Sequence, residues 1–372
     1  MIYTDFKGIQ LSKLGMGNMR LPTIGDDPGG EIDFERAQKI IDYAMDHGVN
    51  YYDTAYVYHN GKSESFLGKA LEKYPRDSYY LATKFFIMAN DDYEAVFEEQ
   101  LSRLKTDYID FYLIHGIFDS NWKQYIDCGC IEYFEEQKAK GHIKYLGFSS
   151  HASVENLTAF TEHHKWDFAQ IQLNYYDWFH GSAMQEYEVL HSRNIPIISM
   201  EPLWGGRLAT LSPEVNAMLK AEHPDWSIAS WAFRWLGRLD GVQVILSGMS
   251  AIDQIKENVK LFQNDISLND GDEELLKRAC DAFRSSVVIP CTGCRYCCDD
   301  CPAQIDIPGI IGLYNRFKLN GSFALLDIGS FKVKPADCTG CNVCGEHCPQ
   351  SIDVSAVMQE LSEAIRALPT RS

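Results

Sequence analysis

Eight of the twelve cysteines in this 372-residue chain stand in two copies of one pattern, C-x2-C-x2-C-x3-C-P. The cysteines of the first copy are Cys291, Cys294, Cys297 and Cys301, and those of the second copy are Cys338, Cys341, Cys344 and Cys348. Three cysteines with two residues between neighbours let one loop reach three irons of a cubane. Structural zinc normally uses two well-separated C-x2-C pairs, and a disulfide scaffold spreads its cysteines through a small secreted domain. The pattern therefore predicts two 4Fe-4S clusters with these eight cysteines as ligands.

The fourth cysteine of each copy is expected to serve the other copy's cluster. In bacterial two-cluster ferredoxins, which the tail resembles, this exchange is the rule. By that resemblance Cys348 would complete the first cluster and Cys301 the second. A short internal repeat, C-P-A-Q-I-D at 301 and C-P-Q-S-I-D at 348, indicates a duplicated unit. Four further cysteines lie outside the pattern and are expected to be ordinary thiols: Cys128, Cys130, Cys280 and Cys298.

Between residues 10 and 262, short β-rich runs alternate with amphipathic stretches of helical spacing. Strands are expected at 11–16, 50–54, 79–85, 108–115, 143–149, 168–174, 196–201 and 242–247. Such strand–helix units, repeated at roughly 30 residues, are typical of a (β/α)8 barrel. A doubly wound sheet would show G-x-G-x-x-G after its first strand, where this chain reads G-M-G-N-M-R. We therefore expect an α/β fold, with a TIM barrel over residues 1–285 and a mostly helical, two-cluster ferredoxin-like domain over residues 286–372.

Polar side chains follow the expected barrel strands, at the end where barrel enzymes carry their chemistry. The four candidates are Asp53, Tyr58, Lys84 and His115. Reduction of a carbonyl needs a hydride on carbon and a proton on oxygen, and a tyrosine can donate that proton if its pKa of ~10 is lowered. A lysine ammonium held by a carboxylate would lower it, and a histidine could orient the carbonyl oxygen. Singly each residue could simply be solvated or packed, but together they indicate a catalytic set.

The stretch D-T-A-Y-V-Y-H-N-G-K-S-E-S-F-L-G from residue 53 resembles the signature of the aldo-keto reductase family. Lys84 and the run Y-L-I-H that ends at His115 match the family as well, and the cysteine-rich tail is similar to a ferredoxin-fused subgroup. The resemblance implies an oxidoreductase that transfers hydride between a carbonyl or alcohol and an extended NADP or NAD, with Tyr58 as the proton donor. It also implies that Ser149 and Gln172 bind the nicotinamide amide.

By the same resemblance, Met200 would lie on the nicotinamide ring and Leu203 would begin the loop that passes the pyrophosphate. The adenosine end would be held by Ser250, Gln254, Glu257 and Asn258. Gly248 and Gln254 stand where many family members place a lysine and an arginine that grip the 2′-phosphate. The choice between NADP and NAD therefore stays open.

The formal net charge of −18 would become more negative with two clusters bound. Such acidity disfavours nucleic acid and anionic membranes as partners. Because no run of ~18 apolar residues occurs, no membrane span is expected. The N-terminal sequence MIYTDFKGIQ is charged where a signal peptide is apolar, so a cytoplasmic location is expected. The expected partners are a small-molecule carbonyl substrate and a redox partner protein.

The expected barrel and the expected cluster domain move electrons differently, because hydride transfer moves two electrons whereas a 4Fe-4S cluster passes one. The role of the clusters is therefore not explained by the catalytic set. Three hypotheses stay open. The clusters could be structural or sensory in a carbonyl reductase, or they could deliver single electrons to a substrate or flavin at the barrel. In the third, the barrel only docks a partner for an electron-transfer module. The complete catalytic set argues against the third. The first is favoured for the chemistry of the barrel, and a redox role of the clusters stays open.

Overall fold

The computed structural model describes residues 1–26, 30–264, 266–284, 287–320 and 322–367. These residues form two compact units. The first unit comprises Met1–Leu203 and Ala229–Glu273, and the second comprises Trp204–Ile228 and the described residues from Glu274 onward. The segment Trp204–Ile228 thus groups with the C-terminal unit, although in sequence it interrupts the first.

Among the described residues of the first unit, eight parallel strands close into a barrel in the order β10-β3-β4-β5-β6-β7-β8-β9. The strands are β3 (Leu14–Gly17), β4 (Tyr51–Asp53), β5 (Tyr80–Phe85), β6 (Ile109–Ile117), β7 (Ile143–Ser150), β8 (Phe168–Gln172), β9 (Ile197–Met200) and β10 (Val242–Ser247). Every residue of β6 is buried, as expected for a parallel strand with packed side chains on both faces. The expected (β/α)8 barrel is confirmed.

The run expected as one strand at residues 11–16 is divided in the structure. Its first part belongs to β2 (Ile9–Ser12), which pairs antiparallel with β1 (Tyr3–Phe6). Phe6 and Leu11 of this hairpin are buried in one apolar cluster with barrel residues such as Phe111. The hairpin therefore extends the barrel core, and its alternating apolar residues were indistinguishable from those of a barrel strand.

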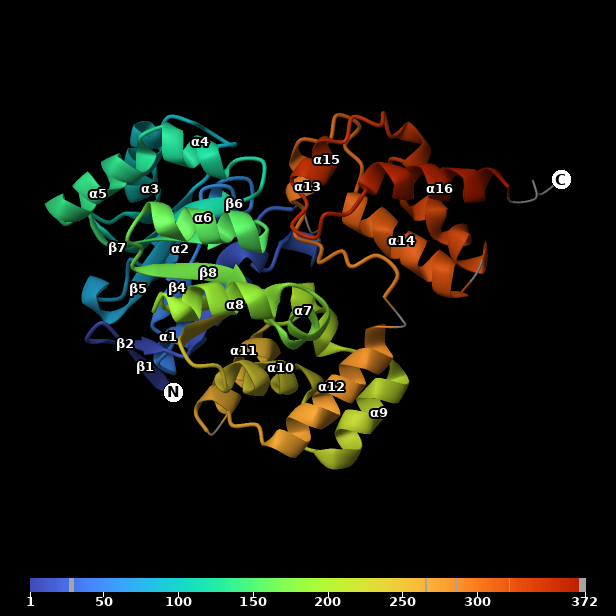
Figure 1. Cartoon of the computed structure of the whole chain (residues 1–372), viewed down its shortest axis with the longest axis horizontal. Coiled ribbons are helices and arrows are strands. Elements are labelled where there is room, and N and C mark those ends of the chain that lie inside the picture. The colour runs from blue at the N-terminus through green and yellow to red at the C-terminus, as the bar shows by residue number, and fades with distance from the viewer. Residues whose placement is uncertain (27–29, 265, 285–286, 321, 368–372) are drawn as a thin grey trace. The chain divides into compact units, whose positions relative to one another are not determined.

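Helices alternate with the barrel strands along the chain (Figure 1). They are α1 (Phe34–Asp46), α2 (Lys62–Leu71), α3 (Tyr93–Leu104), α4 (Trp122–Asp127), α5 (Cys130–Lys140), α6 (Val154–His163), α7 (Tyr175–His180), α8 (Ala183–Ser192), α10 (Ile228–Gly237) and α11 (Ile252–Phe262). Short 3-10 segments are η1 (Asn18–Arg20), η2 (Ile24–Asp26) and η3 (Arg76–Ser78). Local signals set the helix ends: the Asp33 carboxylate accepts the N–H of Arg36, and Gly141, at φ 87°, ends α5.

The second unit is mostly helical, as expected. Its elements are η4 (Trp204–Ala209), α9 (Pro213–Glu222), the greater part of α12 (Asp270–Arg284), α13 (Tyr296–Asp299), α14 (Ile307–Asn320), η5 (Ser322–Ser330), η6 (Pro335–Asp337), α15 (Val343–Glu346) and α16 (Val354–Arg366). Ile310 and Leu313 of α14 and Met358 and Leu361 of α16 are buried in one apolar cluster. The two longest helices after the first cysteine pattern therefore supply the core of this unit.

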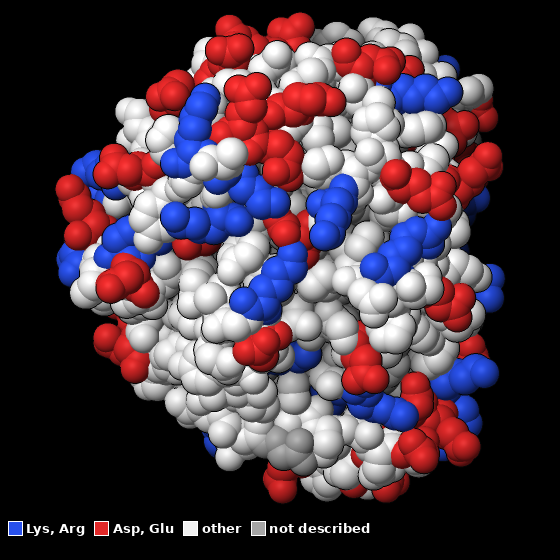
Figure 2. Space-filling view, turned by 60° about the vertical axis from the view of Figure 1, so that its left-hand side comes forward, with Lys and Arg blue, Asp and Glu red and all other residues white. Residues whose placement is uncertain are grey.

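Charged side chains of both signs occur on the displayed face of the molecule (Figure 2). Figure 2 shows acidic and basic side chains interleaved on the face that it displays. Pairs such as Arg193 with Glu162, at 2.8 Å, are partly exposed and contribute only about 0–1 kcal/mol each. No helix in the described ranges is both long and apolar enough to cross a membrane.

Candidate active site and cluster-binding sites

A buried ion pair occupies the interior of the barrel. Lys84 of β5 is fully buried, and its ammonium donates to Asp53 Oδ1 at 2.7 Å, to the Thr54 carbonyl at 2.6 Å and to the Tyr58 hydroxyl at 3.4 Å. Burial lowers the pKa of Lys84 and raises that of Asp53, while each partner's charge opposes the shift of the other. The direct contact stabilises the charged form of each group, because a buried charge that loses its partner costs about 3–5 kcal/mol.

His115 of β6 completes the set around Tyr58. Tyr58 lies in the loop after β4 and is buried, and the centroids of the two rings are 5.9 Å apart at an interplanar angle of 80°. Burial, and then electrostatic repulsion from Lys84 and His151, lower the pKa of His115 well below its usual value. The imidazole is therefore neutral at physiological pH and can donate a hydrogen bond without carrying charge. All four expected catalytic residues thus lie together.

A second polar network supports the strand that carries Lys84. Glu64 of α2 is fully buried and accepts hydrogen bonds from Thr83 Oγ1 at 2.5 Å, Gln100 Nε2 at 2.8 Å and Arg103 Nη1 at 3.2 Å. Gln100 Nε2 also lies 2.9 Å from the Lys84 carbonyl. Sequence reasoning noted Glu64 only as part of the family signature and gave it no role. Its contacts show that it holds α2 and α3 against β5.

The residues expected at the nicotinamide stand at the ends of three neighbouring strands. Ser149 of β7 is buried, and its Oγ accepts the Gly116 N–H at 2.9 Å. Gln172 of β8 and Met200 of β9 are register partners across adjacent strands. Leu203 follows β9 by three residues. The structure therefore brings these residues to one end of the barrel, where the strands terminate.

Asp177 is a neighbour of Gln172 that the sequence did not reveal. Gln172 Nε2 donates to Asp177 Oδ2 at 2.6 Å, and Asn174 Nδ2 donates to the same oxygen at 2.8 Å. Burial raises the pKa of Asp177, and these two amide donors oppose the shift. The position of Asp177 in the first turn of α7, after the cap Asn174, was the available signal. The contact fixes the orientation of the Gln172 amide.

The four residues expected at the adenosine end have different surroundings. Gln254 Oε1 accepts the N–H of Ser250 at 2.8 Å and thereby caps the start of α11. Asn258 is buried, and its Nδ2 donates to Ser247 Oγ at 3.2 Å. Glu257 is exposed on α11. Gln254 and Asn258 therefore have structural partners within this end of the barrel.

The eight pattern cysteines line two hollows in the second unit. The first hollow is lined by Cys291, Cys294, Cys297 and Cys348, and the second by Cys301, Cys338, Cys341 and Cys344. Each hollow thus takes three cysteines from one copy of the pattern and the fourth from the other. Cys298 is not among the residues lining either hollow in the described ranges.

The remaining walls of both hollows are largely apolar. Ile307 and Ile311 line the first, of about 330 Å³, and Ile305 and Met358 line the second, of about 360 Å³. Cysteine thiolates are the ligands of 4Fe-4S clusters, and burial near apolar groups shields a cluster from solvent. The donor set and its surroundings therefore fit one cluster in each hollow.

The loop Trp204–Ala209 packs on the segment that leads into the first cysteine pattern. Arg207 Nη1 donates to the carbonyls of Ile289 at 3.2 Å and Cys291 at 3.4 Å. The Arg207 guanidinium lies 4.6 Å from the centroid of the Trp204 ring. The loop Trp204–Ala209 follows directly on Leu203. Its contacts with Ile289 and Cys291 tie it to the first cluster-binding loop, so each loop stabilises the other.

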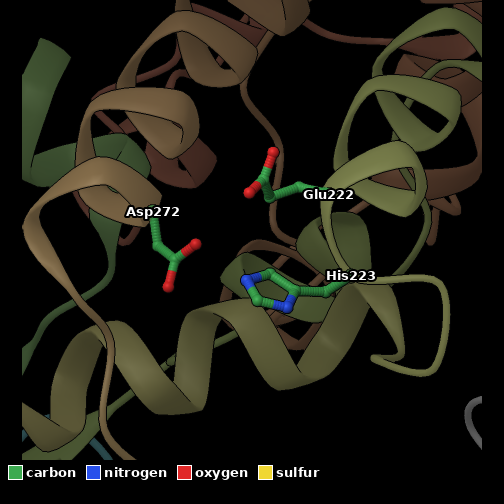
Figure 3. A group of neighbouring side chains, drawn as sticks. All are labelled: Glu222, His223 and Asp272. Atoms are coloured by element: carbon green, nitrogen blue, oxygen red, sulfur yellow. The ribbon is translucent and has the colours of Figure 1, made fainter.

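Three side chains with metal-binding atoms are drawn in Figure 3: Glu222 and His223 at the end of α9, and Asp272 in the first turn of α12. His223 stacks on Trp226 with ring centroids 3.7 Å apart. The N–H of Asp272 donates to Asn269 Oδ1 at 2.9 Å, which fixes the start of α12. His223 and Asp272 thus have local partners. Because Glu222 and His223 belong to the second compact unit and Asp272 to the first, we assign no metal to this group.

Comparison with known families identifies the barrel. The model of the aldo/keto reductase family matches residues 13–273. The chain belongs to the aldo-keto reductase family. A 4Fe-4S dicluster domain matches residues 290–352. This aldo-keto reductase is therefore an oxidoreductase with a C-terminal 4Fe-4S domain.

Individual relatives agree with this assignment. The reductase is 27% identical over 286 residues to an uncharacterized oxidoreductase of Bacillus subtilis, covering 68% of this chain and 87% of the relative. It is 26% identical over 322 residues to the NADH-specific methylglyoxal reductase of Escherichia coli, covering 74% and 96%. The holo form of an aldo-keto reductase from Bacillus halodurans superposes with a TM-score of 0.61 at 25% identity, covering 75% of this chain and 96% of that one. A Klebsiella pneumoniae aldo/keto reductase in complex with NADP and acetate, 23% identical with a TM-score of 0.59 and covering 73% and 93%, shares the fold.

Proposed function

We propose that this aldo-keto reductase interconverts a small carbonyl compound and its alcohol by hydride transfer with NADP or NAD, with Tyr58 as the proton donor. The observation that carries the proposal is the buried contact chain from Asp53 through Lys84 to Tyr58, with the His115 ring beside the Tyr58 ring. One relative is described as NADH-specific and one solved structure contains NADP, so both nucleotides occur among similar proteins.

The nucleotide would supply or accept the hydride when bound. Ser149, Gln172 and Met200 stand at or next to the ends of three consecutive barrel strands and are proposed to hold its nicotinamide, with Leu203 beginning the pyrophosphate loop. The hydrogen bond from Gln172 to Asp177 presets the side-chain amide that would meet the carboxamide. We further propose that the adenosine end lies along Ser250, Gln254, Glu257 and Asn258.

The chain's own groups handle the proton. When Tyr58 gives its proton to the carbonyl oxygen, negative charge develops on the phenol oxygen, and the Lys84 ammonium at 3.4 Å stabilises it. Asp53 holds that ammonium in place at 2.7 Å. Neutral His115 would donate a hydrogen bond to the same carbonyl oxygen and orient it. The expected substrates are small aldehydes and ketones.

We also propose that each cysteine hollow holds one 4Fe-4S cluster, with Cys348 and Cys301 exchanged between the two copies of the pattern. A second candidate function follows from this arrangement. Two complete sets of four thiols would suit a path for single electrons to a substrate, flavin or partner protein, in which case hydride chemistry would be secondary.

The test is carried out on protein purified without oxygen and containing ~8 iron atoms per chain. Carbonyl reduction is measured with methylglyoxal and a panel of small aldehydes and ketones, using NADPH and then NADH. Tyr58→Phe should reduce kcat by about 10²- to 10⁴-fold while nucleotide binding persists. Turnover by Tyr58→Phe near the wild-type rate would contradict the proposal.

The same samples distinguish the second candidate. Visible absorbance of the clusters is followed after addition of NADPH or NADH. Bleaching would show that hydride electrons reach the clusters and that the two halves form one electron path. Substrate turnover with a low-potential one-electron reductant, and none with pyridine nucleotides, would favour the second candidate.

A further inference from the structure

Cys128 and Cys130 form a thiol pair that the proposed reaction does not use. They flank Gly129 in the turn between α4 and α5, where Gly129 adopts a left-handed conformation at φ 82°. Cys128 is half-buried and Cys130 is buried. Each Sγ atom lies 3.6 Å from the carbonyl oxygen of Tyr125. Both sulfurs therefore meet the same oxygen on one side of the turn.

The two thiols also interact with each other. A hydrogen bond from Cys130 lowers the pKa of Cys128 to about 7, against the effect of burial. The same contact, with burial, raises the pKa of Cys130. Near pH 7 a substantial fraction of Cys128 is therefore thiolate, beside the protonated Cys130 thiol. A thiol whose pKa lies near the ambient pH is the most effective attacking group in thiol–disulfide exchange.

Tyr125 connects this turn to the candidate active site. Its buried hydroxyl donates to the His115 carbonyl at 2.6 Å and accepts the N–H of Ile87 at 3.1 Å. Ile87 follows β5, which carries Lys84, and His115 lies on β6. One side chain thus joins the backbone segments that position two of the four candidate catalytic residues. The thiols contact the backbone carbonyl of that same residue.

We propose that Cys128 and Cys130 form a reversible intrachain disulfide, so that the D-C-G-C turn is a redox modification site coupled to the active site through Tyr125. The Cys128 thiolate attacks a low-molecular-weight disulfide, forms a mixed disulfide and releases one thiolate. Cys130 loses its proton to solvent and attacks the Cys128 sulfur, which releases the second thiolate. The cysteine pair is oxidised by two electrons, and the external disulfide is reduced to two thiols.

Oxidation replaces the contact between thiolate and thiol with a covalent S–S bond, after which neither sulfur can donate a hydrogen bond to the Tyr125 carbonyl. The turn must adjust, and the adjustment acts on the residue that bridges the Lys84 and His115 segments. The existence of the disulfide is independent of the proposed function, whereas its effect on turnover rests on it.

The experiment uses the full chain with its clusters, equilibrated without oxygen in mixtures of reduced and oxidised glutathione. Samples are acid-quenched, alkylated, digested and analysed by mass spectrometry, and cluster absorbance is recorded in parallel. The peptide that contains both cysteines should carry two alkyl groups when it is reduced. In more oxidising mixtures it should carry none and be two hydrogen atoms lighter than the unmodified peptide, and dithiothreitol should reverse the change. If both cysteines stay open to alkylation, or each carries its own glutathione, while the clusters are intact, the disulfide proposal is wrong.

Two variants sharpen the result. In Cys130→Ala, half-maximal alkylation of Cys128 should move from near pH 7 toward the ordinary thiol value of about 8.5. Cys280→Ala, which removes another buried cysteine outside the cluster pattern, is the matched control and should leave that profile unchanged. An unchanged profile in Cys130→Ala would contradict the thiol–thiolate contact.

Turnover tests the coupling through Tyr125. Oxidation should lower carbonyl reduction by the wild-type protein by about 3-fold or more, and Cys128→Ser should not respond to the same treatment. A disulfide with unchanged turnover would overturn the coupling while leaving the modification site in place. Absence of carbonyl reduction in every reduced sample would refute the proposed function, and the mass measurement would still decide whether the disulfide forms.

Discussion

The barrel and the C-terminal unit achieve a defined site in opposite ways. In the barrel, Lys84 is held by a carboxylate, a carbonyl and a phenol of the chain itself, and Glu64 braces the strand beneath it. In the C-terminal unit, the cysteines surround two hollows, and the helices within the patterns, α13 and α15, have four residues each. The first site is complete as folded protein, whereas the second depends on what its thiols bind, because bound metal is part of the folding free energy of small cluster domains.

The largest effect is expected from breaking the buried ion pair between Lys84 and Asp53. Lys84→Met leaves Asp53 as a buried, uncompensated carboxylate, so the free energy of unfolding of the barrel should fall by about 3–5 kcal/mol, and carbonyl reduction should be lost. Urea unfolding followed by tryptophan fluorescence measures the first and a turnover assay the second. Adding Asp53→Leu to this variant should recover stability but not turnover. If the single variant is as stable as wild type, the buried pair does not support the barrel.

Cluster ligation is the corresponding test of the other region. Cys344→Ala removes a second-hollow thiol and Cys348→Ala a first-hollow thiol, so each should lose about half of the ~8 iron atoms per chain. Electron paramagnetic resonance of the reduced protein should show a different surviving cluster in the two variants. Cys298→Ala, which alters a cysteine outside both hollows, is the control. Identical spectra from the two variants would contradict the exchange of the fourth cysteine.

Gly205 tests the packing of the loop after β9 on the first cluster loop. A Cβ at Gly205, which has φ 67°, would lie 2.0 Å from the Thr292 carbonyl oxygen, so Gly205→Ala should force the two loops apart. We expect the C-terminal unit to lose about 1–3 kcal/mol of stability and to release iron faster to a chelator. Gly206→Ala is the matched control, because Gly206 has φ 91° but no atom within 4 Å of a Cβ. Equal rates of iron release from both variants would show that the strained backbone conformation, and not the contact with Thr292, causes the loss.

The smallest expected effect concerns pH. The pKa of His115 is well below the usual value in the folded protein, so below about pH 6.5 the unfolded chain binds a proton that the folded chain does not. The free energy of unfolding should therefore fall on acidification by up to about 1.4 kcal/mol per pH unit for this group. His115→Gln should remove that part of the dependence between pH 7.5 and 5.5. Burial lowers the pKa of His151 to about 4, so this residue should add a similar dependence of the unfolding free energy on pH. A His151→Gln variant, which should remove only that second contribution, is the control.

Much of this molecule follows from patterns that are local in the sequence. The alternation of apolar runs indicated the barrel strands, because a parallel strand buried on both faces needs a continuous apolar stretch. Asp53, Lys84 and His115 could be selected because residues near strand ends meet at one end of any such barrel. The division of residues 11–16 could not be foreseen, since the run is too short to show from its apolar residues whether it forms one strand or parts of two.

Other features depend on contacts between distant segments. Nothing in the sequence indicated that Trp204–Ile228 would group with the C-terminal unit. The contact of Gln172 with Asp177 is local, but spacing alone did not show that these two side chains meet. The Cys128–Cys130 pair was expected to be two ordinary thiols. Its interest comes from Tyr125, whose hydroxyl reaches His115 and Ile87.

The sequence by itself determined which chemical groups are present and at which strand ends and loop positions they stand, because the periodicity of strands, helices and cluster loops is set by neighbouring residues. Tertiary structure alone decided which groups touch. It set the distances from Lys84 to Asp53 and Tyr58, and it placed Tyr125 between two backbone segments. The physical reason is that burial, charge pairing and hydrogen-bond geometry act between residues far apart in the chain, where spacing along the sequence carries no information on distance.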